Sequence, residues 1–247
     1  MNNIKQNLKI LFTFLFVYII LFEFALPPND ILPKPSLLLE ALAALFTEYK
    51  ILDKLFITVS AVYGGLILGG ILLFITRNLL FKISLNFDKN LNKLNIFSFI
   101  PAFFYAVLFS FWFESSVLAE IGFAVIAVYF FFVKTYLKEI SEVKPEYIES
   151  AKSLGFSDNK ISGEVIWKSV LPGIFKKINS IHYYIWTGLI IYEFVGNNNG
   201  IGYIYNSIIE YKDLSALIGL AILLSILVLI GTLALNSINK KMINWES

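Results

Sequence analysis

The sequence predicts an all-α membrane protein, a polytopic bundle of transmembrane helices. Hydrophobic residues make up 57% of its 247 residues and charged residues only 15%, whereas about a quarter of a soluble domain is charged. So little charge cannot cover a water-soluble globule. Long apolar segments recur at lengths that suit helices crossing a bilayer. No long linker divides the chain, so residues 1–247 are expected to form one transmembrane domain.

Six segments are apolar and long enough to span a membrane, since about 20 helical residues cross the hydrocarbon core. They are residues 8–26, 55–76, 96–113, 118–137, 174–195 and 214–235. Residues 35–49 are too short and too charged to cross, and they are predicted to form an amphipathic helix at the outer interface. In the second segment, small residues predict close packing against another helix: Gly64, Gly65, Gly69 and Gly70.

The basic residues predict the orientation, because cytoplasmic loops are enriched in Lys and Arg. With the N-terminus inside, sixteen of the 20 basic residues fall on the cytoplasmic side and four outside. We therefore expect a multi-pass protein of the cell (inner, cytoplasmic) membrane with both termini in the cytoplasm. The charged segment 138–173 is then a cytoplasmic loop between the fourth and fifth spans.

Missing residue types exclude several functions. There is no cysteine and one histidine, His182, which excludes thiolate and multi-histidine metal sites. The net charge of +2 does not support a nucleic-acid surface. The chain also lacks the G-x-x-x-x-G-K-[ST] phosphate loop, so it carries no such nucleotide-binding motif itself. We expect no cofactor, no metal, no catalytic residue and no nucleic-acid partner.

The cytoplasmic loop predicts two helices separated by a turn. Pro145 suits the first turn of a helix, and Gly155 suits its end because it accepts a left-handed conformation. Ser157 can cap a second helix, and Pro172 is expected to break the chain where the fifth span begins. The first helix carries an apolar stripe and small residues that allow a partner to approach closely: Tyr147, Ile148, Ser150, Ala151 and Leu154.

This loop resembles the coupling loop of permease subunits of ATP-binding-cassette importers. The family pattern is Glu-Ala-Ala, three residues and Gly, followed by Leu-Pro, and it is matched by Glu149, Ser150, Ala151, Leu154, Gly155, Leu171 and Pro172. The resemblance implies a type I importer permease fold with its core at about residues 55–240. It also implies that the loop sits in a groove of a cytoplasmic ATPase subunit and passes ATPase closure to the spans. A homodimer and an extracytoplasmic substrate-binding protein are implied as well.

Other segments are similar to the nitrate, sulfonate and taurine branch of this family. The similar segments are LPPNDILPKPSLLL (26–39), SAVYGGLILGG (60–70), Pro101 followed by Trp112-Phe113, and Glu193 with Gly200-Ile201-Gly202. One of the two usual Leu-Pro pairs is missing, which indicates a divergent member. The resemblance implies a small substrate such as a sulfonate, taurine, nitrate or a thiamine-type pyrimidine precursor. Candidate residues of the translocation pathway are Ser60, Pro101, Glu193, Gly200 and Gly202.

Several interpretations stay open at this stage. Glu193 is either a pathway or gating residue or a carboxylate that reaches water at the interface, and Glu23 fits the second description better. His182 is expected to be a buried histidine with satisfied hydrogen bonds. Two other classes of function compete with transport. An intramembrane enzyme would need Glu23, Glu193 and His182 to converge, and a scaffold protein would need none of these roles.

Overall fold

The computed structural model describes residues 2–27, 32–86, 102–113, 116–196 and 199–242. All regular secondary structure in these ranges is helical, which confirms the all-α prediction. The elements are α1 Asn2–Ile19, the π-helical η1 Ile20–Ala25, α2 Pro35–Thr47, α3 Ile51–Asn86, α4 Ala102–Trp112, α5 Val117–Glu142, α6 Pro145–Ser153, α7 Asp158–Lys160, the π-helical η3 Ile161–Ile166, α8 Trp167–Gly196, α9 Ile201–Glu210 and α10 Leu214–Met242.

Three of the described helices, α3, α5 and α10, are long and apolar enough to cross a membrane. They cover the second, fourth and sixth predicted spans. The predicted fifth span lies in α8, which has 30 residues. This helix is not among those apolar enough along their length to count as a candidate span. The first and third predicted spans contain shorter apolar helices, Phe12–Ala25 and Phe103–Trp112. Residues 96–101 of the third span lie outside the described residues.

The helices α3 and α5 pack with their backbones in close contact. A Cβ atom at Gly65 would lie 2.7 Å from the Cβ of Ala124, and one at Gly69 would lie 2.6 Å from Cγ1 of Val128. Both distances are shorter than real side chains allow, so glycine is required for this approach. A Cβ at Gly64 would meet no atom within 4 Å. The predicted packing role is thus confirmed for two of the four glycines of this stretch.

A buried histidine joins α3, α8 and α10. His182 on α8 is fully buried, and the indole Nε1 of Trp186 donates a hydrogen bond to its Nε2 at 2.9 Å. Because an indole nitrogen only donates, Nε2 is an acceptor and Nδ1 carries the proton. The hydroxyl of Tyr63 on α3 lies 3.3 Å from Nε2, and the hydroxyl of Thr232 on α10 lies 3.5 Å from Nδ1. His182 is therefore a satisfied core residue, as predicted.

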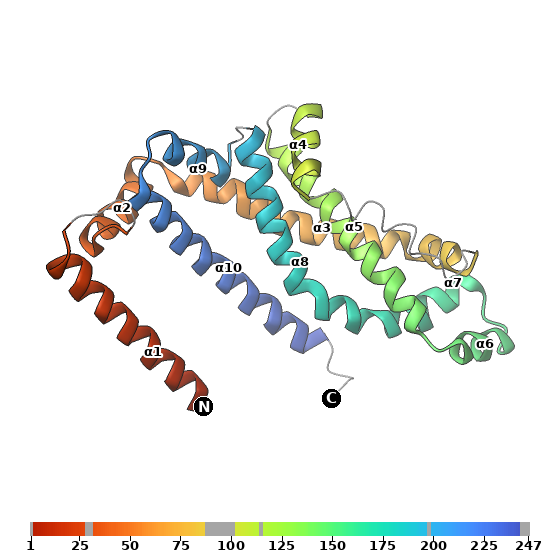
Figure 1. Cartoon of the computed structure of the whole chain (residues 1–247). Helices are drawn as coiled ribbons and strands as arrows, with labels where there is room; N and C mark the ends of the chain where they lie inside the picture. The colour runs from red at the N-terminus through yellow and green to blue at the C-terminus, as the bar shows by residue number, and fades with distance from the viewer. Residues whose placement is uncertain (1, 28–31, 87–101, 114–115, 197–198, 243–247) are drawn as a thin grey trace.

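The N-terminal helix α1 stands apart from the other long helices in Figure 1. It continues into η1, and α2 packs against α10. Glu23 of η1 accepts hydrogen bonds from the backbone nitrogen of Ser36 at 3.0 Å and from its hydroxyl at 3.0 Å. Its carboxylate therefore caps the first turn of α2, where unpaired N–H groups and the helix dipole favour a negative charge.

The segment between α5 and α8 confirms the predicted helix and glycine turn but not the predicted break. Helix α6 begins at Pro145, and Gly155 has φ +76°. Ser157 precedes α7 without a capping hydrogen bond from its side chain. The prediction that Pro172 breaks the chain is wrong, because α8 begins at Trp167 and runs through it. A proline removes one backbone hydrogen bond, and Pro172 is buried, so tertiary packing stabilises the helix around it.

We expect Gly69→Ala to destabilise the protein and Gly64→Ala to leave it unchanged or slightly more stable. The added methyl group at position 69 collides with Val128, which should lower the free energy of unfolding by about 1–3 kcal/mol. At position 64 the methyl group meets open space, and alanine favours the helix over glycine. Thermal unfolding of the two variants in the same detergent compares them directly. Equal unfolding midpoints would contradict the packing assignment.

Candidate functional site

A pocket of ≈ 480 Å³ opens between α6 and the turn that joins η3 to α8. The first side is formed by Tyr147, Ser150, Ala151 and Leu154. The second side is formed by Phe156, Glu164, Val165, Lys168 and Ser169. We call this site the loop pocket. Three of the residues that the family pattern singled out, Ser150, Ala151 and Leu154, line it.

The apolar stripe of α6 is only partly covered by the rest of the chain. Ala151 is buried at 6% exposure, whereas Tyr147 is 55% exposed and Leu154 is 74% exposed. Large apolar side chains that stay exposed beside a hollow are typical of a surface that binds another protein. Gly155 produces this arrangement, since its left-handed turn ends α6 and returns the chain toward α7.

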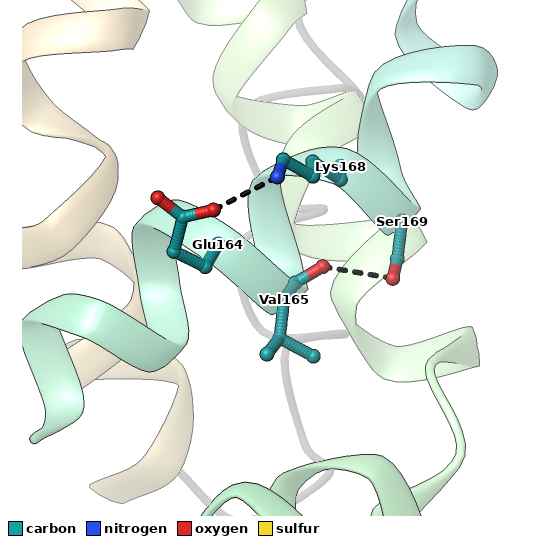
Figure 2. Close-up of polar contacts among 4 residues, drawn as sticks. All are labelled: Glu164, Val165, Lys168 and Ser169. Carbon is teal, nitrogen blue, oxygen red and sulfur yellow. Dashed lines mark hydrogen bonds and ion pairs between the residues drawn. The ribbon is translucent and has the colours of Figure 1, made fainter. Parts of the chain in front are cut away.

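The second side of the loop pocket carries two polar contacts, which Figure 2 shows, beside the apolar side chains of Phe156 and Val165. Lys168 Nζ lies 2.8 Å from Oε2 of Glu164, one helical turn before it. The hydroxyl of Ser169 donates to the carbonyl oxygen of Val165 at 2.8 Å. The hydrogen bond and the positive charge of Lys168 lower the pKa of Glu164. Because both side chains are exposed, the pair stabilises the fold little, and its charges stay available to a partner.

The remaining residues of the predicted coupling pattern lie outside the lining of the loop pocket. Glu149 is exposed on α6, and the hydroxyl of Ser153 donates to its carbonyl oxygen at 3.0 Å. Leu171 and Pro172 belong to the first turns of α8 and are half-buried and buried, respectively. Their contribution is to the packing of α8.

At the other end of α8, a fully buried carboxylate holds the start of α9. Glu193 accepts a hydrogen bond from the hydroxyl of Thr58 on α3 at 2.6 Å and from the backbone nitrogen of Gly202 at 2.8 Å. The hydroxyl oxygen of Thr58 in turn accepts from the backbone nitrogen of Ile201 at 3.0 Å. These bonds satisfy N–H groups that a helix leaves free in its first turn. Glu193 is 0% exposed, so the interpretation that it reaches water is wrong.

Three of the predicted pathway residues thus form one structural unit. A Cβ atom at Gly200 would collide with the carboxylate of Glu193, and one at Gly202 would collide with the Glu193 side chain and the backbone nitrogen of Phe194. Both glycines are needed for space. Ser60 is half-buried on α3 and has no hydrogen bond to this unit. Pro101 lies outside the described residues. Thr58 completes the unit, and no motif or pattern in the sequence predicted that it would bind Glu193.

A second buried carboxylate escaped the sequence analysis. Glu120 lies in the first turn of α5 and is 0% exposed. Neither of its carboxylate oxygens has a hydrogen-bond partner among the residues that the structure describes. Lys54 of α3 is within electrostatic reach, although its ammonium contacts Asn199 Oδ1 at 3.4 Å instead. The signal was available, since a carboxylate inside a predicted span is rare and usually functional.

Glu23, His182 and Glu193 lie in three separate contacts. Glu23 is bound to Ser36, His182 to Trp186, and Glu193 to Thr58 and the start of α9. These three side chains therefore do not lie together, as they would have to in an intramembrane enzyme that used them for catalysis. Within the described ranges, no group of three His, Asp or Glu side chains could hold a metal ion.

The fold and composition define a polytopic helical membrane protein with an exposed loop pocket. Residues 91–244 match the family model of the binding-protein-dependent transport system inner membrane component. This match covers more than half of the chain, and the chain therefore belongs to that family. Its members are permeases of ATP-binding-cassette transporters and not enzymes. A search of curated proteins and a search of solved structures each found no match.

The two buried glutamates should respond oppositely to the same substitution. Glu193→Gln replaces an acceptor oxygen of a fully used carboxylate and should destabilise the protein by about 1–3 kcal/mol. Glu120→Gln replaces a buried carboxyl group that lacks a hydrogen-bond partner among the described residues with a side chain that cannot ionise. It should raise the unfolding midpoint, because keeping an ionisable group buried without a partner is costly. Thermal unfolding in detergent measures both. A destabilising Glu120→Gln would show that its carboxylate has a stabilising partner.

Proposed function

We propose that the chain is the transmembrane permease subunit of an ATP-driven importer. Two copies would form the substrate pathway. Each copy would have six spans, with both termini in the cytoplasm. Two ATPase subunits would bind the loop segment 138–173, and an extracytoplasmic binding protein would deliver the substrate. The observation that supports this proposal best is the loop pocket, with exposed Tyr147 and Leu154 beside it.

The loop pocket suits a protein partner by its chemistry. Its apolar side can receive an apolar side chain of the ATPase, and Ser150 and Ala151 are small enough for a close approach. The Glu164–Lys168 pair on the other wall supplies one charge of each sign at the rim. A dry apolar centre with polar residues around it is the usual anatomy of a binding surface.

Transport then depends on two packings of the helical bundle. Closure of the nucleotide-bound ATPase would favour one of them through the loop segment, and nucleotide release would favour the other. A differential binding free energy of about 5.5 kcal/mol moves such an equilibrium from 1:99 to 99:1. Because the chain has no phosphate loop of its own, this free energy must come from the partner subunit.

The substrate class rests on the resemblance to the nitrate, sulfonate and taurine branch. We propose a small solute such as a sulfonate, taurine, nitrate or a thiamine-type pyrimidine precursor. Uptake of each labelled candidate by cells with and without the gene tests this choice. The proposed orientation can be tested separately, since the chain has no cysteine. A single cysteine at Lys152 should be labelled by a membrane-impermeant thiol reagent only after the membrane is opened.

We expect Leu154→Asp to weaken ATPase binding by about tenfold or more, the effect of losing roughly 1.4 kcal/mol of binding free energy. Leu154 is 74% exposed, so the substitution does not disturb the core. Ala151→Arg and Gly155→Pro should also abolish permease-stimulated ATP hydrolysis. The matched control is Ser153→Arg, an exposed position outside the loop pocket. Co-purification of the ATPase with each tagged variant and its ATP hydrolysis rate are the measurements.

The outcome separates a transporter from a scaffold. A transporter requires that the Leu154 and Ala151 variants lose stimulated hydrolysis while the Ser153 variant keeps it. If hydrolysis is unchanged by Leu154→Asp and by Ala151→Arg, the coupling assignment is wrong. If no ATPase binds to the wild-type chain, a scaffold without transport becomes the better explanation.

A further inference from the structure

The single arginine of the chain lies where the loop segment meets α3. Arg77 is accompanied by nineteen lysines among the 20 basic residues. Its guanidinium Cζ lies 3.7 Å from the ring centroid of Phe74 and 5.4 Å from that of Trp167. The rings of Phe74 and Trp167 also contact each other edge to face, with centroids 5.5 Å apart. The guanidinium thus belongs to a cluster that joins α3 to the first residue of α8.

This cluster and the loop pocket use opposite faces of one helical turn. Glu164, Val165, Lys168 and Ser169 line the pocket. Trp167 contacts the guanidinium, and a Cβ atom at Gly163 would lie 3.8 Å from Nη2 of Arg77. A turn of helix moves as a unit, since its backbone hydrogen bonds hold it together. Displacement of the pocket wall therefore displaces the surface that Arg77 contacts.

The cluster also includes α5. The hydroxyl of Tyr136 donates to the carbonyl oxygen of Arg77 at 3.1 Å, and the rings of Tyr136 and Trp167 have centroids 6.2 Å apart. Tyr136 is fully buried. The turn next to the loop pocket is thus connected to both helices of the tightest packed pair, α3 and α5.

The chemistry of this position requires arginine. The guanidinium is planar and stacks on aromatic rings, whereas the ammonium of lysine is a compact, strongly hydrated charge. Within the described residues, Nε of Arg77 has no hydrogen-bond partner, and Nη1 makes only a long contact of 3.4 Å with the carbonyl oxygen of Phe74. Contacts with the rings therefore dominate the position of this side chain. All other basic residues of the chain are lysines, so a guanidinium occurs only at this site.

The turn between the loop pocket and Arg77 includes part of an irregular segment, since Gly163, Glu164 and Val165 belong to η3. Residues Ile161–Ile166 form the π-helical η3 between α7 and α8. Single π-helical turns are rare and often occur at functional sites. The pocket wall and the Trp167 contact therefore adjoin a segment whose backbone pattern differs from that of an ordinary α-helix.

We propose that Arg77 is a positioning residue that passes movement of the loop pocket to α3 through its contact with Trp167. The inference rests on the proposed function and adds the route by which the ATPase signal enters the membrane helices. Arg77 does not touch the partner in this scheme. Loss of the arginine side chain should stop movement of the loop pocket from reaching α3, without preventing ATPase binding.

The test uses the permease–ATPase complex and a cysteine at Asp53, an exposed position in the first turn of α3. The rate of thiol labelling is compared without nucleotide and after trapping with ATP and vanadate. We expect the wild-type background to show a nucleotide-dependent change. Arg77→Lys should reduce that change by at least about fivefold, the lower end of ordinary coupling between sites, while the ATPase still co-purifies.

Three further variants give the test its controls. Trp167→Leu removes the contact from the other side and should act like Arg77→Lys, whereas Trp167→Phe keeps a ring and should retain most of the response. Lys82→Met, at an exposed position further along α3, should behave like the wild type. A purely structural role would lower the unfolding midpoint and the labelling change together and would not be rescued by phenylalanine.

Each result decides the proposal. A full labelling response in Arg77→Lys and Trp167→Leu overturns it, as does a wild-type complex whose labelling does not depend on nucleotide. Loss of ATPase binding in Arg77→Lys also overturns it, because Arg77 would then shape the docking surface. Failure of the wild-type chain to bind any ATPase is a different outcome, which removes the proposed function and this route with it.

Discussion

The close approach of α3 and α5 at Gly65 and Gly69 is the constraint on which the other contacts of the bundle depend. Helix α3 is 36 residues long, and its two ends lie near α9 and α7 in Figure 1. With the helix held closely against α5, Thr58 donates to the buried carboxylate of Glu193 at one end. At the other end, the guanidinium of Arg77 contacts the ring of Trp167, and the backbone carbonyl of Arg77 accepts a hydrogen bond from the hydroxyl of Tyr136.

Buried polar groups in this apolar chain are used in two contrasting ways. Glu193 has a hydrogen-bond partner on α3, and His182 has partners on α3 and α10 besides Trp186 of its own helix. Both residues therefore stabilise the arrangement in which they are found. Glu120 has no such partner among the described residues, and an unpaired carboxylate in an apolar environment raises the free energy of its conformation.

The loop between α5 and α8 combines local order with an incomplete surface. Helix α6 and the turn at Gly155 form from local signals, and Ala151 anchors them to the core. Tyr147 and Leu154 remain exposed beside the loop pocket, which is unfavourable unless another molecule covers them. The loop thus presents an apolar surface beside the loop pocket.

The sequence by itself determined the fold class, the membrane setting and the local structure of the loop. These properties follow from composition and from short-range signals, such as Pro145 at the start of α6 and Gly155 at its end. The branch, the partners and the substrate stay predictions. Only the tertiary structure decided that Pro172 lies inside a helix and that Glu193 caps α9, because these outcomes depend on contacts between distant segments. Thr58 and Glu193 are 135 residues apart in the chain, and no local pattern predicts that they meet.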